Sequence, residues 1–149
     1  MQNNKGFSLL ELALVIAIIS FLTGAVIIGQ RVSRNANLRA VITEINNYKT
    51  MVENFKIRYG QYPGDFEDAY DFWGSNSHAT DSICNGNGDG IVTISGEDFM
   101  LWRHLQLAEF MPRPLLTGVA SATSAVIDTN VPASKWPLAG YQIHDVTIY

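Results

Sequence analysis

One carboxylate stands at the start of a long uncharged stretch near the N-terminus. Glu11 precedes residues 12–30, where no charged side chain occurs and leucine, valine, isoleucine, alanine and phenylalanine dominate. A membrane helix needs about 20 mostly apolar residues, so this stretch is long enough to span a bilayer. An ionised carboxylate among lipid tails costs roughly 2.5–3.5 kcal/mol. We therefore expect Glu11 to have a partner.

A second group of oxygen-bearing side chains lies in residues 85–90, where asparagine and aspartate alternate with glycine. Calcium loops place ligands at alternate positions, use a glycine for the sharp turn and close with a later acid. Counted from Asn85, the closing position is Gly96, and Glu97 comes one residue late. The alternative is a glycine–asparagine turn without metal. The calcium hypothesis places a structural Ca²⁺ in the loop 81–98, with the candidate ligands Asp81, Asn85, Asn87, Asp89 and Glu97.

Residue patterns typical of enzymes and of nucleic-acid-binding proteins are missing from the sequence. His78, His104 and His144 are scattered, and neither His-Glu-x-x-His nor Gly-x-Ser-x-Gly occurs. Cys84 has no neighbouring histidine or lysine to lower its pKa. From residue 35 onward, seven Lys and Arg face thirteen Asp and Glu, whereas nucleic acid requires a basic surface. We predict that the chain is not an enzyme and does not bind nucleic acid.

One long helix is expected to position Glu11. Apolar residues recur every three or four positions from Leu38 to Tyr59, and no proline occurs between Phe7 and Tyr59. The pattern predicts a helix of about 53 residues, roughly 80 Å long. Its first part, 7–30, would lie in a membrane or a filament core. Its second part, 31–60, is amphipathic and would pack against a head.

Residues 61–149 are expected to form a small α+β head with two short helices and a small antiparallel sheet. Asp65 looks like the cap of the first short helix. Ser95-Gly96-Glu97-Asp98 has the capping pattern of the second, on which His104 and Gln106 are expected near the surface or facing out. Residues 126–131 and 141–148 could form strands. This is material for about two strands, so we expect an incomplete sheet in a short or truncated chain.

The N-terminal segment resembles the type IV prepilin signature. It has a short polar leader, residues 1–6, then Gly6, then Phe7 opening a hydrophobic helix with Glu11 as its fifth residue. The resemblance implies a pilin-like fold and cleavage between Gly6 and Phe7 by a prepilin peptidase, which methylates the new amine. It also implies that Glu11 faces the Phe7 amine of a neighbour in a helical filament of pilin-like subunits.

The same resemblance implies a bacterial inner-membrane protein with one span, an assembly platform as partner and a periplasmic head. Arg31, Arg34 and Arg39 follow the span while Lys5 precedes it, and the positive-inside count favours the opposite orientation. Many type IV pilins close a C-terminal loop with a disulfide. Cys84 is the only cysteine, which favours the pseudopilins of type II secretion. A membrane-anchored, calcium-dependent binding protein that does not polymerise is the alternative function.

Overall fold

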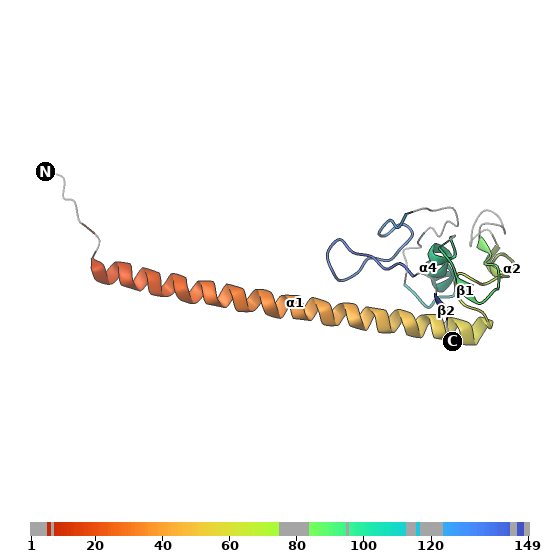
Figure 1. The fold of residues 1–149 in the computed structure, drawn as a ribbon, viewed down its shortest axis with the longest axis horizontal. Coiled ribbons are helices and arrows are strands. Elements are labelled where there is room, and N and C mark those ends of the chain that lie inside the picture. Colours follow the sequence, from red (N-terminus) through yellow and green to blue (C-terminus); the bar gives the residue numbers. More distant parts are fainter. Residues whose placement is uncertain are drawn as a thin grey trace. The chain divides into compact units, whose positions relative to one another are not determined.

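The computed structural model describes residues 6, 8–74, 84–94, 96–112, 116, 124–143 and 146–147. Its elements are α1 (Leu9–Tyr59), α2 (Ala69–Trp73), β1 (Ile91–Val92), α4 (Glu97–Leu107) and β2 (Val146–Thr147) (Figure 1). The α+β architecture predicted from the sequence is confirmed. The chain divides into two compact units, Met1–Arg39 and Ala40–Tyr149, each of which contains part of α1.

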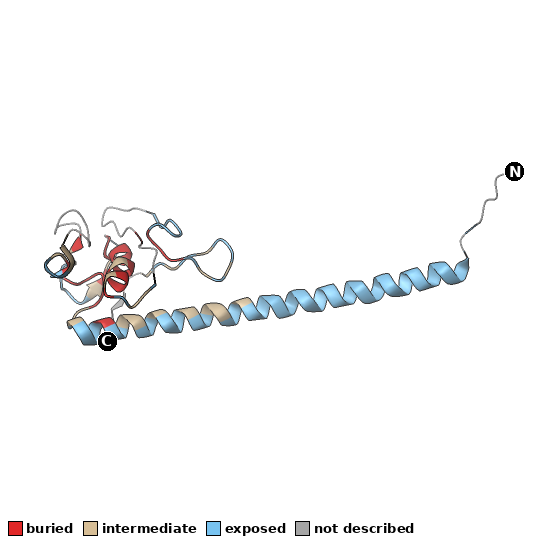
Figure 2. Ribbon diagram, turned by 180° about the vertical axis from the view of Figure 1, so that it is seen from behind, coloured by how far each residue is buried: buried red, intermediate tan, exposed pale blue. Residues whose placement is uncertain are grey.

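The first unit is helical from Leu9 onward, and its apolar side chains are exposed (Figure 2). Leu10, Phe21 and Ile28 have exposed fractions of 79%, 77% and 65%. In the described part of the chain, α1 is the one helix long and apolar enough to cross a membrane. Local patterning and the absence of proline explain why the predicted helix and the observed one agree so closely.

The second unit builds its core between the end of α1 and α4. Phe55 of α1 is fully buried, and Tyr48 contacts Trp102 of α4 edge-to-face with 5.0 Å between ring centroids. Leu105 of α4 is also fully buried. The apolar face predicted for the second part of the helix is therefore confirmed, although its residue Ile45 remains 50% exposed.

The sheet of the second unit is small. In the described residues, β1 and β2 pair antiparallel, with Ile91 opposite Thr147 and Val92 opposite Val146. The sequence did not predict β1, because two apolar residues after a glycine-rich stretch carry no alternation. The strand predicted over 126–131 is wrong: only an isolated bridge joins Ile127 and Val131, around a turn. The strand predicted over 141–148 is reduced to β2 among the described residues.

Two predictions about helix ends and faces are also corrected. Asp65 does not cap α2, which begins four residues later after Asp68. α4 begins after Gly96 without a side-chain cap, and Ser95 lies outside the described residues. His104 and Gln106, expected at or near the surface, are buried, with exposed fractions of 0% and 2%. The reason is that α4 is covered on nearly all sides, so its polar positions do not mark a solvent face.

Candidate functional site

The start of α1 contains a capping arrangement built around Glu11. The Ser8 hydroxyl accepts a hydrogen bond from the Leu10 amide at 3.2 Å, and the Glu11 carboxylate accepts one from the Ser8 amide at 2.9 Å. This reciprocal pair is a capping box, which satisfies backbone donors that the first turn leaves without partners. Gly6 is exposed, and the processing residue Phe7 lies outside the described residues.

The capping box gives Glu11 a local partner, but not a cation. The Ser8 amide is neutral and exposed, so it compensates only part of the cost of placing an ionised carboxylate among apolar side chains. Ser8 and Glu11 form a Ser-x-x-Glu signature, a local pattern in the sequence that indicates this cap. The geometry leaves the carboxylate available at the very end of the apolar helix.

In the head, two acidic side chains that lie outside the glycine-rich stretch 85–90, those of Asp65 and Glu97, accept hydrogen bonds from this part of the chain. We call residues 85–90 the glycine-rich loop. The carboxylate oxygens of Asp65 accept the amides of Asp89 and Gly90 at 3.0 and 2.9 Å. Those of Glu97 accept the amides of Asn87 and Thr93 at 3.1 and 2.9 Å. These are charge-assisted bonds, and they fix the loop against the turn after α1 and the start of α4.

Close packing at this point requires glycine. A side chain on Gly86 would collide with the backbone of Asp65. Burial raises the pKa of Asp65 above its ordinary value, and the Glu97 and Asp89 carboxylates raise it further, whereas the Gly90 and Asp89 amides lower it. Sequence reasoning treated Asp65 as a cap. No local signal could have shown that it reaches residues 24 and 25 positions later.

The predicted calcium ligands are brought together only in part. Asn87, Asp89 and Glu97 lie around the loop, and the Asn87 amide group donates to the Asp89 carboxylate at 3.0 Å. Asn85 is turned elsewhere, because its side-chain oxygen accepts the Tyr70 amide at 2.8 Å. Asp81 lies outside the described residues.

No metal-binding group emerges from the arrangement of these acids. Within the described ranges, no three or more histidine, cysteine, aspartate or glutamate side chains are placed to hold a metal ion. The carboxylates of Asp65 and Glu97 are aimed at backbone amides instead. Because Asp81 lies outside the described residues, the calcium loop stays a prediction.

His104 also joins distant segments of the head through hydrogen bonds. Its Nδ1 accepts the Gly64 amide at 2.9 Å, and its Nε2 lies 2.8 Å from the Cys84 carbonyl, to which it donates. Burial lowers the pKa of His104 from 6.5 to about 4, and the Arg103 charge also lowers it, whereas the bond to the Cys84 carbonyl raises it. The neutral ring thus ties α4 to the two segments that flank α2.

Comparison with known proteins gives one match, at the N-terminus. Residues 1–27 match the family described as the prokaryotic N-terminal methylation motif. The chain carries the prepilin-type cleavage and methylation motif. No curated protein and no solved structure matches the chain.

The match covers the segment that the prepilin resemblance identified, including Gly6, Phe7 and Glu11. It supports a prepilin-like subunit of the type IV pilin and pseudopilin class, processed by a prepilin peptidase. One N-terminal apolar helix together with this motif fits a protein anchored in the inner membrane. The head, residues 61–149, lies outside the match.

Proposed function

We propose that the chain is the precursor of a filament subunit. A prepilin peptidase cuts it between Gly6 and Phe7 and methylates the Phe7 amine. The mature protein then assembles through α1, with other pilin-like subunits, into a type II secretion pseudopilus or a type IV pilus. The head lies in the periplasm before assembly. The observation that carries this proposal is the methylation motif over residues 1–27.

The exposed apolar helix supports assembly rather than simple anchoring. Leu9 to Ile28 of α1 offer apolar side chains on every face, so the helix can contact lipid first and neighbouring helices later. The carboxylate of Glu11 stands at the start of this surface. Cleavage turns the Phe7 nitrogen from an amide into a charged amine, which supplies the cation that the capping box lacks.

Pairing between Glu11 and the Phe7 amine of a neighbour sets the register of the filament. Each charge offsets part of the cost of burying the other, whereas a misaligned subunit would leave one charge buried alone and would cost several kcal/mol. A membrane-anchored protein that does not polymerise has no use for this pairing. The two functions therefore differ in what they require of the Glu11 charge.

Replacing the charge without removing the cap tests this proposal. Glu11→Gln keeps an oxygen that can accept the Ser8 amide, and Glu53→Gln is a matched change at an exposed carboxylate. Both variants are expressed with a prepilin peptidase and an assembly platform, and filament incorporation is measured by shearing and immunoblotting. We expect Glu53→Gln to assemble and Glu11→Gln to be processed but excluded. Normal incorporation of Glu11→Gln would reduce Glu11 to a helix cap and contradict the proposal.

A further inference from the structure

One turn of the head presents a leucine to solvent in a strained backbone conformation. Leu138 is 99% exposed and has a φ of 58°, which a bulky residue rarely adopts and which asparagine tolerates better. The Ser134 amide donates to the Ala139 carbonyl at 2.8 Å, and the Ala139 amide donates to the Trp136 carbonyl at 3.3 Å. We call residues 134–139 the tip loop. Strain that the surrounding bonds maintain at an exposed apolar side chain indicates a functional constraint.

The tip loop is bonded to α1 near the end of the second unit that continues into the apolar span. The Glu44 carboxylate accepts the Lys135 amide at 3.0 Å and the Tyr141 hydroxyl at 2.8 Å. The second unit begins at Ala40, so this contact lies within its first five residues (Figure 1). α2 packs instead on the last turn of α1. The tip loop therefore belongs to the end of the head from which the chain runs toward the membrane.

The part of α1 between the span and the tip loop is short enough for the loop to meet the bilayer. Glu44 follows Gln30 by fourteen residues, which is about 21 Å of helix. The chain from Lys135 to Leu138 can extend about 10 Å from its bond to Glu44, and a headgroup layer is about 6 Å thick. The remaining distance of about 5 Å is closed by a tilt of α1, because membrane helices tilt by about 20° on average and by up to about 40°.

The composition of the tip loop fits the surface of a bilayer and differs from the rest of the head. Residues 132–141 contain no aspartate or glutamate, whereas residues 65–109 contain nine of them and one arginine. Anionic lipids repel the acidic surface but not the tip loop. Trp136 is of a type enriched at the level of lipid headgroups, and Lys135 can keep its charge there. Leu138 supplies the apolar side chain.

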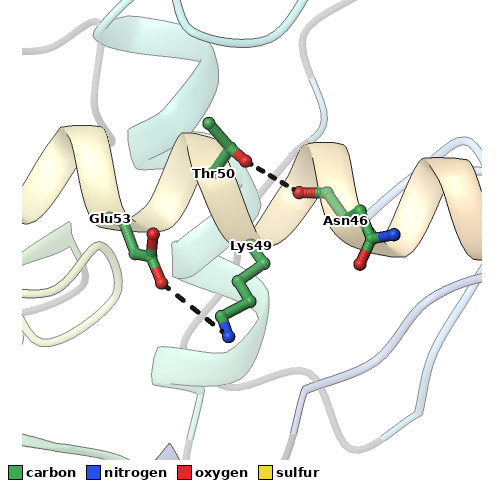
Figure 3. A network of polar contacts seen from close by, with 4 residues as sticks. All are labelled: Asn46, Lys49, Thr50 and Glu53. Atoms are coloured by element: carbon green, nitrogen blue, oxygen red, sulfur yellow. Dashed lines mark hydrogen bonds and ion pairs between the residues drawn. The ribbon is translucent and has the colours of Figure 1, made fainter.

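The exposed side of α1 in the second unit carries charged groups instead. Lys49 and Glu53 form an i,i+4 ion pair at 4.0 Å, and their side chains are 75% and 59% exposed. The Thr50 hydroxyl beside them donates to the Asn46 carbonyl at 2.9 Å (Figure 3). Charged groups lose hydration when they enter lipid, so this face is suited to water. The tip loop, by contrast, contains Lys135 as its one charged residue.

We propose that the tip loop binds the phospholipid bilayer that holds α1. In the unassembled subunit Leu138 enters the headgroup region, with Trp136 and Lys135 at the level of the headgroups. The span keeps this bilayer close to the loop, so the contact forms at a high effective concentration. It fixes the head against the membrane surface. The contact rests on membrane anchoring and not on filament formation, and it therefore goes beyond the proposed function.

Quenching of tryptophan fluorescence by brominated lipids tests the contact. The full chain is reconstituted, at a low ratio of protein to lipid, into vesicles of zwitterionic and anionic phospholipids that carry bromine close to the headgroup. Comparison with Trp136→Phe gives the part of the quenching that belongs to Trp136, because Trp102 is buried and Trp73 is half-buried in the head. We expect Trp136 to be quenched in the unmodified chain. Absence of this quenching would overturn the proposal.

Leu138→Asn separates lipid contact from folding. Asparagine tolerates a φ of 58°, so the variant should be at least as resistant to urea as the unmodified chain. The quenching of Trp136 should fall about tenfold, because a polar side chain replaces the apolar one. The control is Ile57→Asn, at an 82% exposed isoleucine near the other end of this part of α1, which should leave the quenching unchanged. Full quenching in Leu138→Asn would count against the lipid contact.

The ratio of protein to lipid distinguishes a bilayer from a second copy of the chain. A contact with lipid gives the same quenching of Trp136 at every ratio. A loss of water exposure at Trp136 that occurs only at a high ratio, without quenching by bromine, would assign the tip loop to a neighbouring subunit and overturn the proposal. Either negative result leaves the proposed function standing, because cleavage after Gly6 and filament incorporation are measured separately.

Discussion

Acid should unfold the head through His104. In the folded chain the neutral ring accepts the Gly64 amide on Nδ1 and donates to the Cys84 carbonyl through Nε2. Protonation would place an N–H on Nδ1, directly against the N–H of Gly64, in a position that water does not reach. Compared with the unfolded chain, where water surrounds the charged ring, the buried charged ring therefore has no hydration and lacks the hydrogen bond from the Gly64 amide.

The size of the effect follows from the two pKa values. The pKa of His104 is about 4 in the folded chain and 6.5 when the ring is exposed. Because the unfolded chain binds more protons between these values, the free energy of unfolding is highest above pH 6.5 and falls as the pH decreases toward 4. Between pH 7 and pH 5, this one group removes about 2 kcal/mol of stability.

Urea unfolding of the full chain in detergent micelles measures this loss. All three tryptophans lie in residues 61–149, so their fluorescence reports on the head. His104→Gln keeps a donor and an acceptor but takes no proton in this range. We expect the variant to be less stable at pH 7, and its stability to change less than that of the wild type between pH 7 and pH 5. An equal loss of stability between pH 7 and pH 5 in the wild type and in His104→Gln would refute the reasoning.

Two further predictions concern the glycine-rich loop. Asp65→Asn should lower the free energy of urea unfolding by about 1.5–3 kcal/mol, because an NH₂ group replaces one of the two oxygens that accept the Asp89 and Gly90 amides. The control is Asp71→Asn, at an exposed position on α2, which should change the free energy of unfolding by no more than about 0.5 kcal/mol. The calcium loop predicted from the sequence requires that added Ca²⁺ raise the urea midpoint and that EDTA reverse the increase. An unchanged midpoint would contradict that prediction.

The long helix could be predicted because its determinants are local. Periodic apolar residues, the absence of proline and the basic residues Lys56 and Arg58 in the last turn act within a few positions of each other. The helix ends at Tyr59, directly before Gly60, whose φ of 80° is the left-handed conformation typical of a residue that stops a helix.

The head was harder to predict because its determinants are far apart in sequence. The residue types of the glycine-rich loop indicated that Asn87, Asp89 and Glu97 lie together, and they do. The contribution of Asp65 depends on a tertiary contact that no local pattern encodes. His104 was misplaced for a related reason: burial of α4 on most faces removes the link between polarity and exposure.

The most direct test of the account is the intact mass of the protein extracted from membranes of cells with a prepilin peptidase. We predict the mass of residues 7–149 plus one methyl group, with fragmentation placing the methyl on the Phe7 nitrogen. An uncut N-terminus that still contains residues 1–6 would contradict the account, because Glu11 would then have no neighbouring amine to meet.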